Sequence, residues 1–149
     1  IQYVLGHWAF RHLDLAVDRR VLIPRPETEQ VVDVALGELD RLLADRPKGR
    51  RATVIDLGTG SGAIALAVAT ERPGTDVWAV DVEPDAVAVA RANLAGLGMA
   101  GTRVRVVEGA CPALPPHSFC LATRIELERP SCASRWSLVA CGLYAAVLQ

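Results

Sequence analysis

The sequence predicts an α/β fold: an incomplete, Rossmann-like parallel sheet that is preceded by a β-hairpin and a helix. From residue 52 onward, β-branched segments alternate with helical patterns in the order strand, helix, strand, helix, strand. Such alternation is typical of a parallel sheet with right-handed crossovers. The first of these strands also runs directly into a glycine-rich turn that opens a helix. A turn of this kind forms the ligand-binding corner of doubly wound sheets.

Length and composition indicate one globular domain. The chain has 149 residues, of which 51% are hydrophobic and 22% are charged, so it can bury a core and is too apolar to be disordered. Its net charge of −1 gives no argument for nucleic acid, and we do not expect direct nucleic-acid binding. Neither a secretion signal nor an apolar stretch of bilayer length is visible, so we expect no membrane partner.

The four cysteines indicate neither a metal site nor a disulfide framework. They form no Cys-x-x-Cys pair and have no histidine at zinc-ligand spacing. We therefore expect reduced thiols, no metal and a cytoplasmic protein. The cysteines are Cys111, Cys120, Cys132 and Cys141.

Residues 1–51 are expected to form a hairpin, a proline-rich loop and a helix that lead into the core of the domain. Alternating apolar residues over 13–17 predict a short strand. A second strand over 21–23, after a turn at 18–20, would complete the hairpin.

The loop after the hairpin contains Pro24 and Pro26, which keep it extended because each proline restricts the backbone and removes a hydrogen-bond donor. Acidic residues then begin a helix. This helix is predicted to run to about Asp45, and residues 46–51 follow it as a solvated linker. Its apolar stripe at helical spacing consists of Val32, Leu36, Leu39 and Leu43.

Residues 52–109 carry the alternating elements of the sheet. The three predicted strands are 54–57, 76–81 and 104–108. The helix between the first two strands begins at residue 63 and is predicted to be buried on most of its sides. The second helix is expected from Pro84 to about Leu97. Its residues at helical spacing are Val87, Ala90, Arg91 and Leu94.

The glycine turn, Gly58-Thr59-Gly60-Ser61-Gly62, has a spacing that separates the possible ligands. A dinucleotide fingerprint needs a glycine at position 63, where this chain has Ala63. Asp56 followed by glycines at alternate positions instead looks like the first motif of methyltransferases that use S-adenosylmethionine (SAM). A glycine-rich turn without a ligand is the alternative interpretation.

Asp81 ends the second predicted strand, 19 residues after Gly62. An acid at the carboxyl end of that strand can accept hydrogen bonds from the ribose hydroxyls of a nucleoside. Asp81 can also act as a helix N-cap or turn residue, since a helix follows at Pro84, and one carboxylate can serve both roles. The candidate residues for binding a nucleoside cofactor are Gly58, Thr59, Gly60, Ser61, Gly62 and Asp81.

Three segments carry a resemblance to a known family. They are Gln2-Tyr3-Val4-Leu5-Gly6, Leu22-Ile23-Pro24-Arg25-Pro26-Glu27-Thr28-Glu29 and Asp56-Leu57-Gly58-Thr59-Gly60-Ser61-Gly62-Ala63-Ile64-Ala65-Leu66. Through them, residues 1 to about 109 resemble the peptide chain release factor N5-glutamine methyltransferases, the HemK-like family. The middle segment is the most specific, because few other methyltransferases place it upstream of the glycine turn.

The resemblance implies a SAM-dependent enzyme that methylates the side-chain amide of the glutamine in the Gly-Gly-Gln motif of a release factor. It implies that residues 58–62 and Asp81 contact SAM, and that a release factor is the protein partner. In the family, a helical domain precedes the catalytic domain. This chain, which begins at Ile1 without a methionine, is expected to start after that domain.

The chain departs from the family pattern at two places. Ala110 and Cys111 stand where the family carries an acid, often followed by an aromatic residue, near the adenine. The family motif Asn-Pro-Pro-Tyr, whose asparagine and proline carbonyl orient the substrate amide, is absent. The one asparagine is Asn93, and Pro115-Pro116-His117 has neither the asparagine nor the aromatic residue. We therefore assign no catalytic residue and expect the chain as written to be inactive.

Residues 110–149 do not continue the pattern of strands and helices. They contain all four cysteines but no aspartate and no lysine. Fifteen arginines against one lysine indicate GC-rich coding DNA, in which a shifted reading frame meets few stop codons. Because local signals normally agree across a real domain, we interpret this tail as out of frame, and the sheet would then end after its third strand. A divergent but genuine C-terminus is the alternative.

Other functions stay open at this point. N6-adenine nucleic-acid methyltransferases share the fold and the chemistry, although no basic stripe or aromatic platform is visible here. A non-catalytic SAM-binding remnant would account for the missing motif. A dehydrogenase is disfavoured by Ala63.

Overall fold

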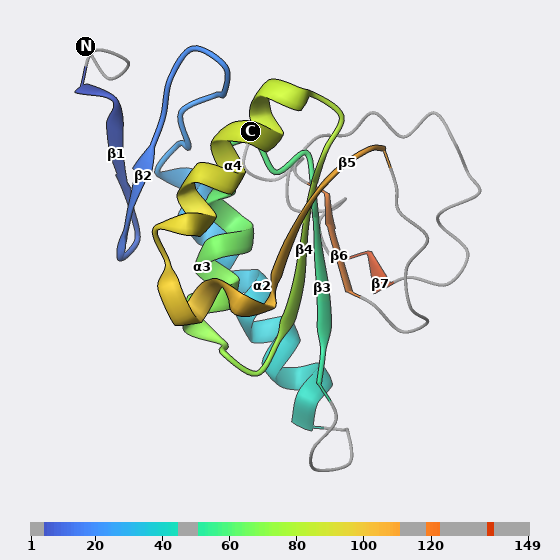
Figure 1. The fold of residues 1–149 in the computed structure, drawn as a ribbon. Coiled ribbons are helices and arrows are strands. Elements are labelled where there is room, and N and C mark those ends of the chain that lie inside the picture. The colour runs from blue at the N-terminus through green and yellow to red at the C-terminus, as the bar shows by residue number, and fades with distance from the viewer. Residues whose placement is uncertain (1–4, 45–50, 111–118, 123–136, 139–149) are drawn as a thin grey trace.

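The computed structural model describes residues 5–44, 51–110, 119–122 and 137–138 (Figure 1), and for the last two segments it describes the backbone alone. A parallel sheet carries helices on one side, and a two-stranded hairpin packs on the outer side of these helices. Hairpin, helices and sheet therefore follow one another from left to right in Figure 1.

The elements have the following bounds. The hairpin consists of β1 (His7–Phe10) and β2 (Leu13–Ala16). The helices are α2 (Glu27–Ala44), α3 (Ala63–Glu71) and α4 (Pro84–Ala95), with a short 3-10 helix, η1 (Gly98–Arg103), after α4. The strands of the sheet are β3 (Thr53–Leu57), β4 (Asp76–Asp81), β5 (Val104–Glu108), β6 (Phe119–Ala122) and β7 (Ser137–Leu138).

The sheet has the strand order β5-β4-β3-β6-β7, and all its described pairings are parallel. The chain thus builds outward from β3 in one direction through β4 and β5, and then in the other direction through β6 and β7. Strand order reverses beside β3, and ligands of doubly wound sheets bind at the carboxyl ends of strands at such a point. The predicted class, a Rossmann-like sheet preceded by a hairpin and a helix, is confirmed.

Helix α3 is enclosed by its neighbours. Every residue from Ala63 to Ala69 is buried, because the sheet lies on one side of the helix and α2 lies on another. The prediction of a helix buried on most of its sides is therefore confirmed. Such a helix has little freedom to shift, and it fixes the position of the glycine turn at its N-terminus.

One apolar core joins the hairpin, α2 and the sheet. Phe10 comes from the hairpin, Leu39 from α2 and Leu66 from α3, and each is at most 1% exposed. From the sheet, Val54 and Val77 enter the same core. The N-terminal elements are thus packed into the domain that carries the glycine turn.

The hairpin differs from its prediction in which strands it joins. The strand at Leu13–Ala16 pairs with His7–Phe10 before it, in a register that runs from Phe10 opposite Leu13 to His7 opposite Ala16. The predicted strand over 21–23 is wrong. Val21 donates its N–H to the Asp18 carbonyl at 3.2 Å, which closes a turn there instead.

Helix α4 is covered on two sides. It packs against β4 and β5 on one side and against β2 on the other. Of the residues predicted at helical spacing, Val87 and Ala90 are buried and Arg91 is exposed, and Asn93 is buried as well. The helix ends at Ala95 rather than at Leu97.

The sheet does not end after its third strand. Strand β6 pairs with β3 in parallel, from Val54 opposite Phe119 to Leu57 opposite Ala122, and β7 pairs with β6. The rest of the tail lies outside the described residues. The segment Gln2-Tyr3-Val4 and most of the predicted linker at 46–51 also lie outside them. Among the helices that the structure describes, none combines the length and apolar character needed to cross a membrane.

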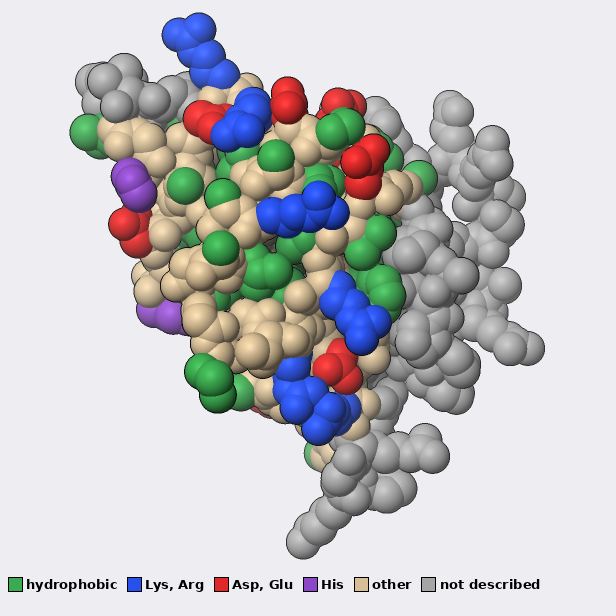
Figure 2. All heavy atoms as spheres, viewed as in Figure 1, with side chains coloured by type: hydrophobic (Ala, Val, Ile, Leu, Met, Phe, Trp, Pro, Cys, Tyr) green, Lys and Arg blue, Asp and Glu red, His purple; other side chains and the backbone are tan. Residues whose placement is uncertain are grey.

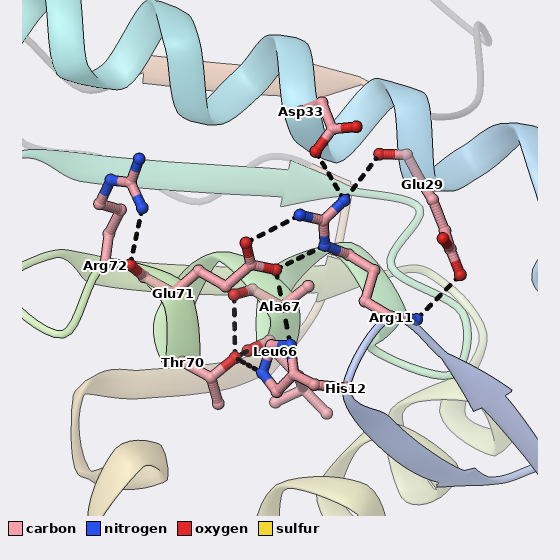
Figure 3. Close-up of polar contacts among 9 residues, drawn as sticks. All are labelled: Arg11, His12, Glu29, Asp33, Leu66, Ala67, Thr70, Glu71 and Arg72. Atoms are coloured by element: carbon pink, nitrogen blue, oxygen red, sulfur yellow. Dashed lines mark hydrogen bonds and ion pairs between the residues drawn. The ribbon is translucent and has the colours of Figure 1, made fainter.

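Arg11 fastens the tip of the hairpin to both neighbouring helices (Figure 3). Its Nε and Nη2 donate to the two carboxylate oxygens of Glu71 on α3, at 2.5 and 2.8 Å. Its Nη1 donates to Asp33 Oδ1 on α2 at 2.7 Å, and its backbone N–H donates to Glu29 Oε1 at 2.9 Å. Charged, bidentate hydrogen bonds are stronger than neutral ones, and here they hold Arg11 at a left-handed φ of 52°.

The pairing of Arg11 with Glu71 makes stability depend on pH. The Arg11 guanidinium, hydrogen-bonded to Glu71, holds the pKa of that carboxyl below its ordinary value of 4.5. Because the folded-state pKa is the lower one, the pair stabilises the fold above the ordinary pKa. This stabilisation is lost as the pH falls through the folded-state pKa.

We expect Glu71→Gln to lower the free energy of unfolding at neutral pH by about 1.5–3 kcal/mol, which is typical of a charged hydrogen bond. Solvent screens this pair little, because the Arg11 and Glu71 side chains are only 17% and 22% exposed. Urea unfolding of both proteins measures the difference. As the pH falls below 4.5, their stabilities should converge.

Asp40→Asn is the matched control, because it removes a carboxylate from the more exposed Arg72–Asp40 pair, whose side chains are 35% and 52% exposed. A surface pair contributes little, so this loss should be the smaller one. Equal losses from the two substitutions would contradict the special role of Arg11.

Candidate functional site

The candidate site lies where β3 and β4 end. These strands are parallel and in register up to Leu57 opposite Val80, so they end at the same edge of the sheet. The backbone N–H groups of Gly58 and Thr59 both donate to the Val80 carbonyl, at 2.8 and 3.0 Å. The glycine turn therefore begins against the end of β4, next to Asp81.

Asp56 supports the glycine turn from the inside of the protein. It is 1% exposed, and its Oδ2 accepts hydrogen bonds from Thr59 Oγ1 at 2.7 Å and from the Ala65 N–H at 3.2 Å. The carboxylate thus joins the end of β3 to the turn and to the first turn of α3, where a negative charge is favourable. Asp56 is part of the sequence motif, but its spacing gives no indication of this supporting role.

Asp81 holds the turn from the neighbouring strand. Its Oδ2 accepts a hydrogen bond from the Gly60 N–H at 2.9 Å, and its Oδ1 accepts one from the Glu83 N–H at 3.1 Å. Glu83 is the N-cap residue of α4, so Asp81 also organises the turn that begins this helix. A carboxylate has about four acceptor positions, and these two contacts among the described residues occupy two of them.

Gly60 and Gly62 serve different purposes in the turn. Both have a left-handed backbone, with φ values of 56° and 85°, which favours glycine. A Cβ at Gly62 would lie 3.2 Å from Leu66 Cδ1 and 3.5 Å from Ala90 Cβ, so this glycine lets two helices approach closely. A Cβ at Gly60 would meet nothing within 4 Å, so this part of the turn faces open space.

Thr59 and Ser61 can offer a ligand little of their side chains. These residues are only 6% and 2% exposed. Thr59 Oγ1 donates to Asp56, and the Thr59 carbonyl accepts the Gly62 N–H at 2.9 Å. The structure therefore brings together all six candidate residues, but Thr59 and Ser61 contribute mainly through the backbone.

Asn93 is a further residue of the site, and the sequence analysis did not identify it as one. It lies on α4, is 9% exposed, and donates from Nδ2 to the Ser61 carbonyl at 2.8 Å. Its Nδ2 also donates to the Ala16 carbonyl, and its Oδ1 accepts the Ala16 N–H. A lone asparagine among the apolar residues of a helix is the only sequence signal for it.

The end of β5 lies next to Asp81. Glu108 is opposite Asp81 in the register, and the Gly109 N–H donates to the Asp81 carbonyl at 2.8 Å. Ala110 follows as an exposed residue, and Cys111 lies outside the described residues. This edge thus brings the ends of three strands together, without an acidic residue at position 110.

A metal centre needs clustered ligand side chains, and a nucleic-acid surface needs clustered basic ones. Within the part of the chain that the structure describes, no group of three or more His, Cys, Asp and Glu side chains could hold a metal ion. On the face drawn in Figure 2, basic (blue) and acidic (red) side chains alternate among the described residues. No single-sign surface of the kind that attracts nucleic acid is visible on this face.

A reversing parallel sheet, with a glycine turn hydrogen-bonded to an acid on the next strand, defines a Rossmann-like fold. The chain belongs to the methyltransferase small domain family, whose model matches residues 28–114, more than half of the chain. This finding confirms the class predicted from the glycine spacing.

Curated relatives confirm the resemblance to the HemK-like family. A release factor glutamine methyltransferase of Gloeobacter violaceus is 50% identical over 99 residues, which are 66% of this chain and 32% of that protein. One of Bifidobacterium longum is 47% identical over 94 residues, which are 63% of this chain and 30% of that protein. The chain thus spans about a third of the length of the curated relatives it matches.

Solved structures show the same fold at low identity. The N-terminal domain of human METTL16, in complex with SAH, has a TM-score of 0.56 to this chain and is 21% identical to it. The match covers 74% of this chain and 45% of that one. At this identity the likeness concerns the fold alone.

We expect Gly62→Ala to destabilise the fold more than Gly60→Ala. Both substitutions place a side chain at a left-handed backbone position, which costs about 1–3 kcal/mol. Gly62→Ala adds the close contact with Leu66, whereas the new methyl group at Gly60 meets open space. Urea unfolding of the two variants measures the difference. A larger loss for Gly60→Ala would show that the turn packs differently from this description.

Proposed function

We propose that this chain binds SAM on the glycine turn and Asp81, and that it is part of an enzyme that methylates the glutamine of the Gly-Gly-Gln motif in a peptide chain release factor. The observation that carries this proposal is the hydrogen bond from the Gly60 N–H to Asp81 Oδ2, which joins the two halves of the predicted cofactor site. The relatives named release factor glutamine methyltransferase supply the substrate. A release factor works in translation, so we place the protein in the cytoplasm.

The residues at this edge fit SAM. The open space beside Gly60 leaves room for a ligand against the backbone. Asp81 keeps acceptor positions for two ribose hydroxyls after its contacts with Gly60 and Glu83. The METTL16 domain, which has the same fold, is in complex with SAH, and SAH is what remains of SAM after methyl transfer. When bound, SAM would supply an electrophilic methyl group.

The substrate side of the proposed site is incomplete in the chain as written. An amide nitrogen is a poor nucleophile, so its hydrogens need acceptors that orient it. After β6, where the family has Asn-Pro-Pro-Tyr, this chain reads Thr123-Arg124-Ile125-Glu126. Asn93 offers no replacement, because its amide is already hydrogen-bonded to Ala16 and Ser61. A second candidate function, a SAM-binding remnant without catalysis, is favoured by this difference.

We further propose three parts for the chain. Residues 1–51 lead into the catalytic domain, residues 52–109 form the SAM-binding core, and residues 110–149 are an atypical tail that is out of frame. The loss of the family motif after β6 supports this interpretation of the tail, whereas the pairing of β6 with β3 as a further strand of the sheet counts against it. Reading the coding DNA across codons 105–115 tests it directly: a restored frame that encodes Asn-Pro-Pro-Tyr is expected, and an intact frame would contradict it.

Calorimetry with SAM and with NAD tests the proposed cofactor. We expect SAM to bind more tightly than NAD. Gly60→Val should abolish binding, because the branched side chain fills the open space beside the turn. Asp81→Asn should weaken it about 10- to 100-fold, since hydrogen bonds to a charged group contribute about 1.5–3 kcal/mol.

Asp76→Asn is the control for Asp81→Asn, because Asp76 lies at the other end of the same strand and pairs with Arg103. It should leave the affinity for SAM unchanged. Tighter binding of NAD than of SAM would contradict the methyltransferase assignment.

A methyl-transfer assay with labelled SAM and a release factor tests catalysis by the chain as written. We expect no turnover even where SAM binds, because each missing orienting contact typically lowers the rate about 10²- to 10³-fold. A chain in which β6 is followed by Asn-Pro-Pro-Tyr should gain activity. Robust methylation by the unaltered chain would mean that another group orients the amide.

A further inference from the structure

We propose that Asn93 is a positioning residue for the cofactor site, and that it couples the N-terminal hairpin to the glycine turn. This inference rests on the proposed function, because it takes the glycine turn as the place where SAM binds. Asn93 lies on α4 and is not one of the six residues predicted to bind the cofactor. It acts through the backbone of Ser61 and has no contact with a ligand in this account.

Three of the four hydrogen-bonding positions of the Asn93 amide group are used by the hairpin and the glycine turn. Oδ1 accepts the Ala16 N–H at 2.7 Å, while the two protons of Nδ2 go to the Ala16 carbonyl at 3.0 Å and the Ser61 carbonyl at 2.8 Å. A carboxamide has one acceptor oxygen and two donor protons, so its orientation here is fixed. The reversed amide would place NH2 against the Ala16 N–H.

The contact with Ser61 fixes the middle of the turn. Ser61 is 2% exposed and lies between two left-handed glycines, Gly60 and Gly62. Glycines adopt many backbone conformations, so the peptide between them needs an outside partner to hold one orientation. Asn93 supplies that partner, and a buried carbonyl without a partner would be unfavourable.

The contact with Ala16 extends the effect to the hairpin. Ala16 ends β2, and both its N–H and its carbonyl bond to Asn93, 77 residues away in the chain. Hairpin docking and turn conformation therefore share one side chain. Thermodynamic coupling is reciprocal, so a ligand that stabilises the turn should also stabilise the hairpin at Ala16.

Hydrogen exchange on the unsubstituted chain tests the coupling without risk to the fold. With saturating SAH, we expect the Ala16 amide to exchange several-fold more slowly. The Thr75 amide, bonded to the Arg72 carbonyl at the opposite edge of the sheet, should change little. Slowing at residues 58–62 without slowing at Ala16 would overturn the coupling, as would equal slowing at Ala16 and Thr75.

Asn93→Asp tests the positioning role by calorimetry. Aspartate can still accept the Ala16 N–H, but it cannot donate to the two carbonyls, so we expect the Kd for SAM to rise at least 10-fold. Val89→Ala is the control: Val89 is buried on the same helix and lies in the apolar core. It should lower the melting temperature by a similar amount with the Kd unchanged.

The outcomes separate the two proposals. If the unsubstituted chain does not bind SAM, the proposed function fails, and this inference fails with it. If the unsubstituted chain and Asn93→Asp bind SAM equally well, only the role of Asn93 is overturned. If Asn93→Asp and Val89→Ala weaken SAM binding equally, the effect comes from lost stability alone. That result would also overturn the positioning role of Asn93.

Discussion

One hydrogen bond, from the Gly60 N–H to Asp81 Oδ2 at 2.9 Å, joins the ends of the two central strands, and the site depends on it. The bond can form because β3 and β4 are parallel and end at the same edge. The same carboxylate accepts the Glu83 N–H, so the start of α4 is set by the residue that holds the turn. The register of β3 and β4 therefore places the backbone of the glycine turn next to the Asp81 carboxylate.

The turn is supported from several directions, which keeps a glycine-rich segment in one conformation. Asp56 accepts hydrogen bonds from Thr59 in the turn and from the first turn of α3. Asn93, on α4, donates a hydrogen bond to the Ser61 carbonyl. Helix α3 is buried along most of its length. The hairpin adds a further constraint, because Arg11 ties it to Glu71 at the other end of that helix. Sites are most precise when rigid elements and outer hydrogen bonds fix them.

The sequence predicted those features whose causes are local. β-Branched runs and a glycine turn mark the strands and the cofactor corner, so β3, β4 and β5 lie where they were expected. The hairpin was misplaced because its turn contains Arg11, whose left-handed backbone is stabilised by residues of α2 and α3 rather than by a glycine. Asn93 was missed for the same reason, since its partners lie 77 and 32 residues away. The pairing of β6 with β3 gives no local signal either.

The central claim is that SAM binds at the edge formed by the glycine turn and Asp81. Amide chemical shifts of the labelled chain during titration with SAM test it most directly. The account predicts that the signals of Gly58, Gly60 and Glu83 move together and saturate. Gly74 and Thr75, which precede β4 at the opposite edge, should stay in place. Saturable shifts at Gly74 and Thr75 without shifts at the glycine turn would contradict the account.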